Sequence, residues 1–315
     1  MAGIKNLVKD TAIYGLSSIV GRFLNWLLVP LYTIMFTAGE YGVVTFVYAV
    51  VALAMVILTY GMETGFFRFA NHERWSDPKE VYSTSLISLA VSSTAFVALV
   101  AIFIEPATKL MECDGHPSYV LMMAACVAID AFLGIPYSYL RFCNRPMRFA
   151  LLRLVNIGLN IGLNLFFILL CPTLYKLSPE VVGTFYSPDF GIGYIFLANL
   201  ISSAVTLVMM IPELRGFKWR FNSTLWREML HYSAPLLVLG IAGIMNQTID
   251  KILYPHLVSD QATAMHELGI YGANYKIGVL LLVFLQAFRF AYEPFIFARS
   301  KDKEQGKMQA YRDAM

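Results

Sequence analysis

The sequence has few charged residues: Asp, Glu, Lys and Arg make up only 14% of its 315 residues, whereas 58% are hydrophobic. A soluble domain typically carries about 25% charged and 45–50% apolar residues. A chain with so few polar side chains cannot cover a water-soluble surface of this length. The composition therefore excludes a cytosolic enzyme and a disordered protein.

Cysteine is also scarce, and the motifs that carry catalytic chemistry are missing. The four cysteines form no CxxC pair and have no spacing with histidine that suggests a zinc site. The sequence contains no GxSxG, HExxH, Walker or GxGxxG motif, and its five histidines are scattered. We therefore expect a protein that is not an enzyme and that uses no metal and no cofactor.

Eight long apolar segments occupy most of the chain. Each reaches the roughly 20 residues that a helix needs to cross about 30 Å of hydrocarbon. A barrel strand needs only about 10 residues of alternating polarity, so the uniform hydrophobicity of these segments favours helices. We predict an all-α polytopic membrane protein with eight transmembrane helices, at approximately residues 11–35, 43–66, 83–104, 119–140, 149–171, 190–211, 233–254 and 270–297.

The basic residues are distributed unevenly between the two sides of this predicted topology. With a cytoplasmic N-terminus, 18 of the 24 Lys and Arg residues fall on the cytoplasmic side, and only Lys109 and Lys176 fall in outside loops. The positive-inside rule describes this asymmetry. The sequence therefore predicts a cytoplasmic N-terminus, and it supports eight spans because losing one would disturb the alternation.

A short motif occurs twice at an offset of 230 residues. G-x-Y-G stands at 39–42 and at 269–272. In each copy a glutamate follows 21 residues after the second glycine, and a phenylalanine follows four residues after that glutamate. Six predicted spans separate the copies, and an even number preserves their orientation. This pattern indicates two parallel six-helix lobes.

The repeat predicts how the chain is divided. We expect an N-terminal six-helix lobe over 1–225 and the first two helices of a C-terminal lobe over 226–315. A complete second lobe would extend to about residue 450 by the same repeat. We therefore expect the chain to be a piece of a longer protein, the alternative being a natural eight-span protein.

Four basic residues lie inside predicted spans, at Arg22, Lys251, Lys276 and Arg289. A charged side chain at the bilayer centre costs at least about 2.5 kcal/mol, so these residues should face a polar cavity or a partner. The guanidinium of Arg22 suits a phosphate bidentately, although it could instead pair with an acid such as Asp130 or Glu63. Together the four cations indicate an anionic ligand bound between the lobes.

Amides form the second set of candidate substrate-binding residues. Asn156, Asn160 and Asn164 are four residues apart and share one face of the fifth predicted helix. Such a row could line a wet pathway and bind sugar hydroxyls, or it could hold neighbouring helices together by hydrogen bonds. Asn25 in the first span and Asn246 in the seventh complete the set.

Carboxylates inside or at the edges of the spans are candidates for binding a coupling proton or Na⁺. These are Glu63, Asp130, Asp250 and Glu293. Asp250 and Lys251 are adjacent and point about 100° apart on a helix, so we do not expect them to pair with each other. Arg289 and Glu293 are four residues apart and can pair within their helix.

Taken in order, several loose motifs carry a resemblance to a known family. They are Tyr14-Gly15 and Gly21-Arg22 in the first span, Phe36-Thr37-Ala38-Gly39-Glu40-Tyr41-Gly42 after it, the basic turn from Arg141 to Arg153, Pro235 and Asp250 in the seventh span, Gly269-Ile270-Tyr271-Gly272, and Glu293-Pro294-Phe295. The chain resembles the polysaccharide biosynthesis and oligosaccharide flippase family of the multidrug/oligosaccharidyl-lipid/polysaccharide exporter superfamily.

The resemblance implies a function. It implies a flippase in the bacterial inner membrane that moves a lipid-linked oligosaccharide, with an anionic polyprenyl diphosphate head, between leaflets by alternating access. Members typically have twelve to fourteen spans in two lobes, and this chain has eight. Two alternatives remain: a drug or cation antiporter of the same superfamily, which should favour an acidic cavity, and a membrane glycan polymerase or glycosyltransferase, which should need a larger outside loop or an acidic catalytic pair.

Overall fold

The computed structural model describes residue 15 and residues 19–21, 23–75, 77–113, 115–215 and 220–299, with side chains for all of these except 282–284 and 286–299. This part of the chain is almost entirely helical and contains no strand. The main helices are α2 (Leu28–Met35), α3 (Ala38–Thr59), α4 (Met62–Ala70), α5 (Pro78–Ile102), α6 (Ile104–Leu110), α7 (Pro117–Phe142), α8 (Pro146–Asn164), α9 (Cys171–Leu177), α10 (Pro179–Val182), α11 (Gly193–Met209), α12 (Ser223–Leu257) and α13 (Gln261–Arg299). A π-helical segment, Leu165–Leu170, joins α8 to α9.

The helices coincide with the predicted spans. Within the described residues, the segments long and apolar enough to cross a membrane are Ala38–Ala70, Pro78–Ile102, Pro117–Phe142, Pro146–Leu177 and Ser223–Leu257. Two shorter apolar helices, Ile19–Met35 and Gly193–Met209, lie at the first and sixth predicted spans, and α13 covers the eighth. The all-α polytopic fold is therefore confirmed, and the count of eight spans stays a prediction.

Short polar side chains fix where two long helices begin. The Thr37 hydroxyl accepts the Glu40 N–H at 3.3 Å while the Glu40 carboxylate accepts the Thr37 N–H at 2.8 Å, which forms a capping box ahead of α3. The Asn222 side-chain oxygen accepts the N–H groups of Thr224 and Leu225 at 3.0 and 3.1 Å ahead of α12. These contacts satisfy N–H groups that the first turn of a helix leaves unpaired.

The second predicted span is not one continuous helix. Tyr60 (φ 35°) and Gly61 (φ 70°) both adopt left-handed conformations, and they separate α3 from α4. The Gly61 carbonyl accepts the Ser233 hydroxyl of α12 at 3.3 Å. The span predicted over 43–66 lies within the apolar segment Ala38–Ala70, and the structure divides that segment into two helices at Tyr60 and Gly61.

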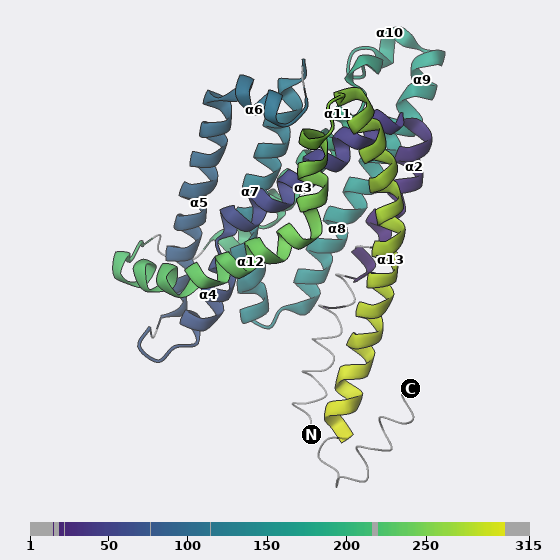
Figure 1. Cartoon of the computed structure of the whole chain (residues 1–315). Coiled ribbons are helices and arrows are strands. Elements are labelled where there is room, and N and C mark those ends of the chain that lie inside the picture. The colour runs from purple at the N-terminus through teal and green to yellow at the C-terminus, as the bar shows by residue number, and fades with distance from the viewer. Residues whose placement is uncertain are drawn as a thin grey trace.

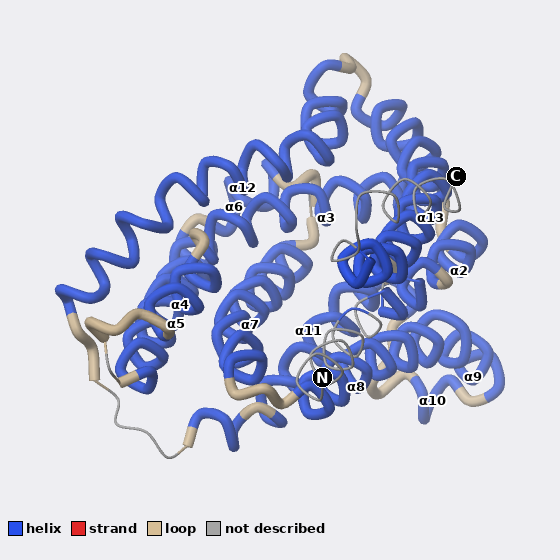
Figure 2. The backbone as a smooth tube through the Cα atoms, turned by 90° about the horizontal axis from the view of Figure 1, so that it is seen from below, coloured by secondary structure: helices blue, strands red, loops and turns tan. Residues whose placement is uncertain are grey.

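The last two described helices pack across the rest of the bundle. Figure 1 shows α12 running obliquely from α4 towards the start of α13, and Figure 2 shows it along one side of the bundle. Where α13 crosses α3, a Cβ atom added to Gly42 would lie 1.9 Å from the Met265 carbonyl oxygen, and one added to Gly269 would lie 1.8 Å from the Ala38 carbonyl oxygen. Gly42 and Gly269 belong to the two copies of the repeated motif, so the two copies touch each other.

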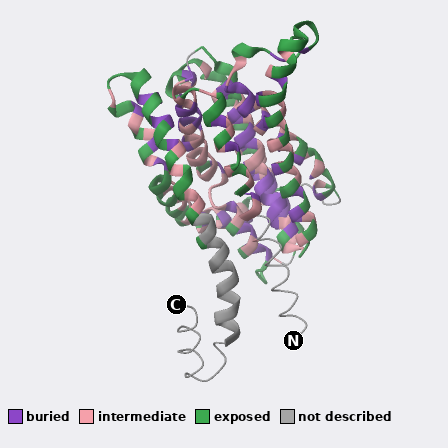
Figure 3. Ribbon diagram, turned by 90° about the vertical axis from the view of Figure 1, so that its right-hand side faces the viewer, coloured by how far each residue is buried: buried purple, intermediate pink, exposed green. Residues whose placement is uncertain are grey.

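The outward faces of the helices are apolar. In Figure 3 exposed residues follow the outer faces while buried residues lie between the helices. Large aliphatic side chains are among the most exposed, for example Val91 (64%), Ile102 (75%) and Leu239 (69%). An apolar surface of this extent marks a lipid-facing or partner-facing region, and with the long apolar helices it makes the chain a multi-pass membrane protein.

Candidate functional site

A cavity of about 930 Å³ lies between α2, α3, α8, α11, α12 and α13, with one wall formed by α7. Its walls contain seven of the residues that the sequence singles out: Asn25, Asp130, Asn156, Asn160, Asn246, Lys251 and Lys276. These residues come from five different helical segments, so only the packed bundle brings them together. The cavity is large enough for a drug-sized or larger ligand.

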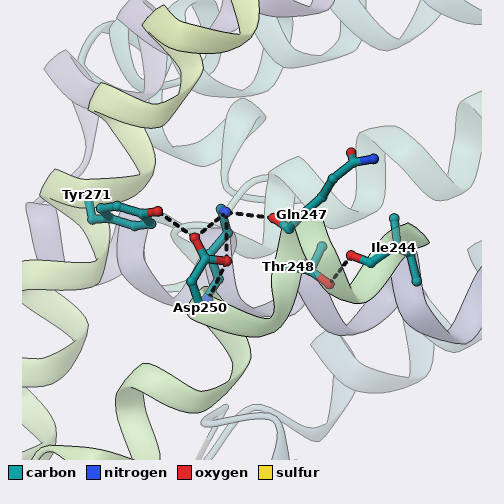
Figure 4. A network of polar contacts seen from close by, with 6 residues as sticks. Ile244, Gln247, Thr248, Asp250 and Tyr271 are labelled. Carbon is teal, nitrogen blue, oxygen red and sulfur yellow. Dashed lines mark hydrogen bonds and ion pairs between the residues drawn. The ribbon is translucent and has the colours of Figure 1, made fainter. Parts of the chain in front are cut away.

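Lys251 takes part in a polar network with Gln247, Asp250 and Tyr271, the three of which are labelled in Figure 4. Its Nζ lies 3.0 Å from Oδ2 of Asp250 and donates to the Gln247 carbonyl at 2.8 Å. Tyr271 of α13 donates to the same Asp250 carboxylate, and the Lys251 ammonium lies 3.6 Å from the centroid of the Tyr275 ring. The network joins α12 to α13 at the edge of the cavity.

The expectation that Asp250 and Lys251 do not pair is wrong. Side chains on a helix tilt towards its N-terminus. The four-carbon stem of Lys251 follows that tilt, which brings its ammonium group over Gln247 and beside the carboxylate of Asp250. A long flexible side chain therefore overcomes the 100° separation of neighbouring Cβ atoms.

Lys276 presents the second cation of the cavity. It lies on α13, its backbone carbonyl accepts the Trp26 indole N–H at 3.0 Å, and its side chain lines the cavity. Among the described residues, no carboxylate lies within 4.0 Å of its ammonium group. Lys276 is thus better placed than Lys251 to meet an anion in the cavity.

The asparagine row on α8 divides between two roles. Asn156 and Asn160 line the cavity, and Asn156 donates to the Thr206 hydroxyl at 2.9 Å. Asn164 is fully buried: its side-chain oxygen accepts the Tyr32 hydroxyl at 2.9 Å, and its amide donates to the Asn160 carbonyl at 2.8 Å. Asn164 therefore ties α8 to α2 and does not line the cavity.

Asp130 is the acid on the cavity wall. The Cys126 thiol donates to it at 3.8 Å, and the same thiol lies 3.5 Å from the Ser203 hydroxyl. Asp130 makes no ion pair with any described residue. The guanidinium of Arg153 acts on this carboxylate electrostatically without forming an ion pair with it.

The remaining candidates lie elsewhere. Glu63 pairs with Arg141 at 3.3 Å and also accepts the Ser138 hydroxyl, away from the cavity lining. Asp250 contacts Lys251 but is itself outside the lining. Arg22 and the side chains of Arg289 and Glu293 lie outside the described residues.

One wall of the cavity was not predicted. Asn199, Ser202 and Ser203 of α11 line it, and Asn199 donates to the hydroxyl of Tyr48 at 2.7 Å. These side chains recur on one face of an otherwise apolar span, with Thr206 a turn further on. That polar stripe was the available signal in the sequence.

Comparison with known proteins places the chain in a family. The structure is similar to the crystal structure of the MATE transporter VcmN of Vibrio cholerae in the bent form, with 13% sequence identity and a TM-score of 0.49 over 95% of this chain and 72% of that one. No match was found among curated proteins. The sequence profile described as "polysaccharide biosynthesis protein" matches residues 7–297, which is most of the chain. The chain therefore belongs to the polysaccharide biosynthesis protein family.

Proposed function

We propose that this chain is a transporter that flips a lipid-linked oligosaccharide, with a polyprenyl diphosphate head, across the bacterial inner membrane for surface polysaccharide biosynthesis. The observation that carries the proposal is the cavity between the helices, which combines two lysines with a set of amides. Flipping by alternating access forms and breaks no covalent bond, so it requires no catalytic residue. Membership of the polysaccharide biosynthesis family supports this function.

Lys276 favours an anionic substrate over a cationic drug, because no described carboxylate lies within 4.0 Å of its ammonium group. Lys251 and Lys276 line the cavity, whereas Asp130 is the one carboxylate among the described lining residues. Asp250 balances Lys251, which leaves Lys276 available to a diphosphate. Hydrogen bonds to charged groups contribute about 1.5–3 kcal/mol each.

The amides suit the glycan. Asn25, Asn156, Asn160 and Asn246 supply donors and acceptors to the cavity from three different helical segments. Sugar hydroxyls both donate and accept, so they match side-chain amides better than they match apolar walls. The lipid tail of the substrate would remain in the bilayer beside the helices.

Asp130 is the best placed of the proposed coupling residues. It lines the cavity that holds the lysines, so a proton or Na⁺ bound there would alter the field that an anionic head experiences. We propose that this cation exchanges during each transport cycle. Glu63 is less suitable because Arg141 neutralises it.

The proposed orientation places the N-terminus in the cytoplasm. In the predicted topology 18 of the 24 basic residues lie on the same side of the membrane as the N-terminus, and the positive-inside rule assigns that side to the cytoplasm. The division into a lobe over 1–225 and the start of a second over 226–315 also remains a proposal. The contact between the two copies of the glycine motif supports related halves.

Binding of a polyprenyl diphosphate-linked oligosaccharide to the purified chain in nanodiscs tests this function. We expect Lys276→Gln to weaken binding on the order of tenfold, which corresponds to about 1.4 kcal/mol and lies at the low end of a charged hydrogen bond. Lys276→Arg should retain most of the affinity. The matched control is Lys176→Gln in a predicted outside loop, which should leave affinity unchanged.

Reconstituted vesicles separate binding from coupling. Asp130→Asn should retain substrate binding but lose any dependence of flipping on a proton or Na⁺ gradient. Equal affinity of the Lys276→Gln and Lys176→Gln proteins would refute the assignment of the cavity to an anionic head. Tight binding of cationic drugs by the unaltered chain, with none of the lipid-linked glycan, would instead identify an antiporter.

A further inference from the structure

A second pocket, of about 520 Å³, lies between α5, the start of α12 and the break between α3 and α4. Tyr60, Ile87, Ser88, Val91, Ser92, Phe221, Trp226 and Leu230 line it. Val91 and Phe221 are 64% and 46% exposed, so the pocket opens to the surroundings of the bundle. It is separate from the central cavity, since Leu230 and Ile244 on α12 are about 21 Å apart along the helix.

The polar atoms of this pocket are already bonded within the protein. The hydroxyls of Tyr60 and Ser88 lie 2.6 Å apart, and the Trp226 indole N–H donates to the Ser88 hydroxyl at 2.7 Å. The Ser92 hydroxyl donates to the Leu89 carbonyl at 3.2 Å. What remains accessible is aromatic and aliphatic, so the pocket suits a hydrocarbon chain and offers little to a polar ligand.

The depth of the pocket matches the acyl region of one leaflet. The predicted span begins at residue 83, and the lining residues Ile87 and Ser92 lie about 6 and 14 Å further along α5. Half of the hydrocarbon core of a bilayer is about 15 Å thick. The pocket therefore extends from the end of the helix towards the middle of the membrane.

Two arginines stand next to lining residues of the pocket. Arg220 and Arg227 are exposed and directly adjacent in the sequence to the lining residues Phe221 and Trp226. Neither arginine forms an ion pair with a described residue. Two acids lie nearby: Glu228 is paired with Arg74 at 3.0 Å, and the Glu80 carboxylate accepts the Asn222 side-chain amide at 2.9 Å. A lipid with an anionic head therefore fits the charge at this end.

We propose that this pocket binds an acyl chain of an anionic phospholipid, with the lipid head at Arg220 and Arg227. The chain would lie against Tyr60, the residue at the break between α3 and α4. Lipid binding here would therefore stabilise the broken form of the span. The inference stands independently of the substrate proposed for the central cavity.

Quenching of Trp226 fluorescence by brominated acyl chains tests the proposal. A chain with Trp26→Phe, Trp75→Phe and Trp219→Phe retains Trp226 alone. It is placed in phosphatidylcholine nanodiscs that contain a small fraction of phosphatidylglycerol with brominated acyl chains. The reference reporter is Val208→Trp in a chain whose four native tryptophans are Phe, because Val208 is 63% exposed near the end of α11 at the same basic side.

We expect Trp226 to be quenched on the order of threefold more strongly than the reference tryptophan at the same lipid fraction. Ser92→Leu should abolish this excess by filling the pocket, whereas Thr94→Leu, on the exposed face outside the lining, should preserve it. The double variant Arg220→Gln, Arg227→Gln should reduce the excess to the level measured with brominated phosphatidylcholine.

Equal quenching of Trp226 and the reference tryptophan would overturn the proposal, because both residues would then contact only the bulk lipid around the protein. Displacement by unlabelled polyprenyl phosphate, but not by unlabelled phosphatidylglycerol, would also overturn it and assign the pocket to an isoprenoid. If the single-tryptophan chain fails to fold, the difference in quenching between the unaltered chain and Trp226→Phe supplies the same measurement.

Discussion

The close crossing of α3 and α13 predicts an unusual sensitivity to one methyl group. Gly42 and Gly269 allow these two helices to touch backbone to backbone. We expect Gly269→Ala to destabilise the fold, because the added Cβ would lie 1.8 Å from the Ala38 carbonyl oxygen. The obstacle is main chain, so no side-chain rotation can relieve it.

The expected magnitude follows from that distance. The crossing must widen by roughly 1.2 Å before the contact reaches the 3.0 Å lower limit of real Cβ contacts, and overpacking of this kind costs about 1–3 kcal/mol. Because backbone is the obstacle, we take the upper end of this range. Replacing Gly by Ala inside a helix contributes about 1 kcal/mol in the opposite direction. The net loss in the free energy of unfolding should therefore be about 2 kcal/mol.

Unfolding in mixed micelles, followed by circular dichroism during a titration with sodium dodecyl sulfate, measures this free energy. The matched control is Gly278→Ala on the same helix, where an added Cβ meets nothing within 4 Å. Gly39→Ala is a second control in the first copy of the motif, with equally open space. A Gly269→Ala chain as stable as the Gly278→Ala chain would refute the close crossing.

Three further predictions concern other contacts. Asn222→Ala should lower the free energy of unfolding by about 1 kcal/mol, because α12 loses the side chain that caps its first turn; Asn222→Ser, which keeps a capping oxygen without placing a second carboxylate beside Glu80, should retain most of it in the same titration. Asn164→Leu should destabilise by about 1–3 kcal/mol, since it leaves the buried Tyr32 hydroxyl without its acceptor, and the additional change Tyr32→Phe should recover part of the loss. Hydrogen bonds from the Thr263 hydroxyl and N–H hold the pKa of Asp260, in the turn before α13, below its usual value. Its stabilising contribution should therefore be complete above about pH 3.9 and lost as the pH falls through the lower folded value, so the melting temperatures of the unaltered chain and Asp260→Asn should converge on acidification.

The helical segments could be predicted from composition because lipid imposes one strong constraint. A backbone in hydrocarbon must satisfy its own hydrogen bonds, so a long apolar run becomes a helix almost regardless of its particular side chains. The break at Tyr60 and Gly61 could not be predicted in this way. It coincides with a contact to α12, which lies far away in the sequence: the Ser233 hydroxyl donates to the Gly61 carbonyl, which also accepts the Gly65 N–H at 3.1 Å.

The candidate site could be predicted only in part. Polar residues in apolar spans identified Asn156, Asn160, Lys251 and Lys276, because an unpaired polar group in lipid is costly. The same rule could not separate cavity residues from helix-joining residues. Asn164 shares a face with Asn160, yet its register places it against Tyr32 rather than in the cavity.

By itself, the sequence determined that this protein is a bundle of membrane helices and which polar residues require an explanation, and it predicted which side of the membrane the basic loops face. These properties follow from local hydrophobicity and charge, which act over one span at a time. The tertiary structure decided which of those residues face a common cavity, that Asp250 neutralises Lys251, and that the two glycine motifs meet at the α3–α13 crossing. Those outcomes depend on distances between helices far apart in the chain, and only close packing sets such distances.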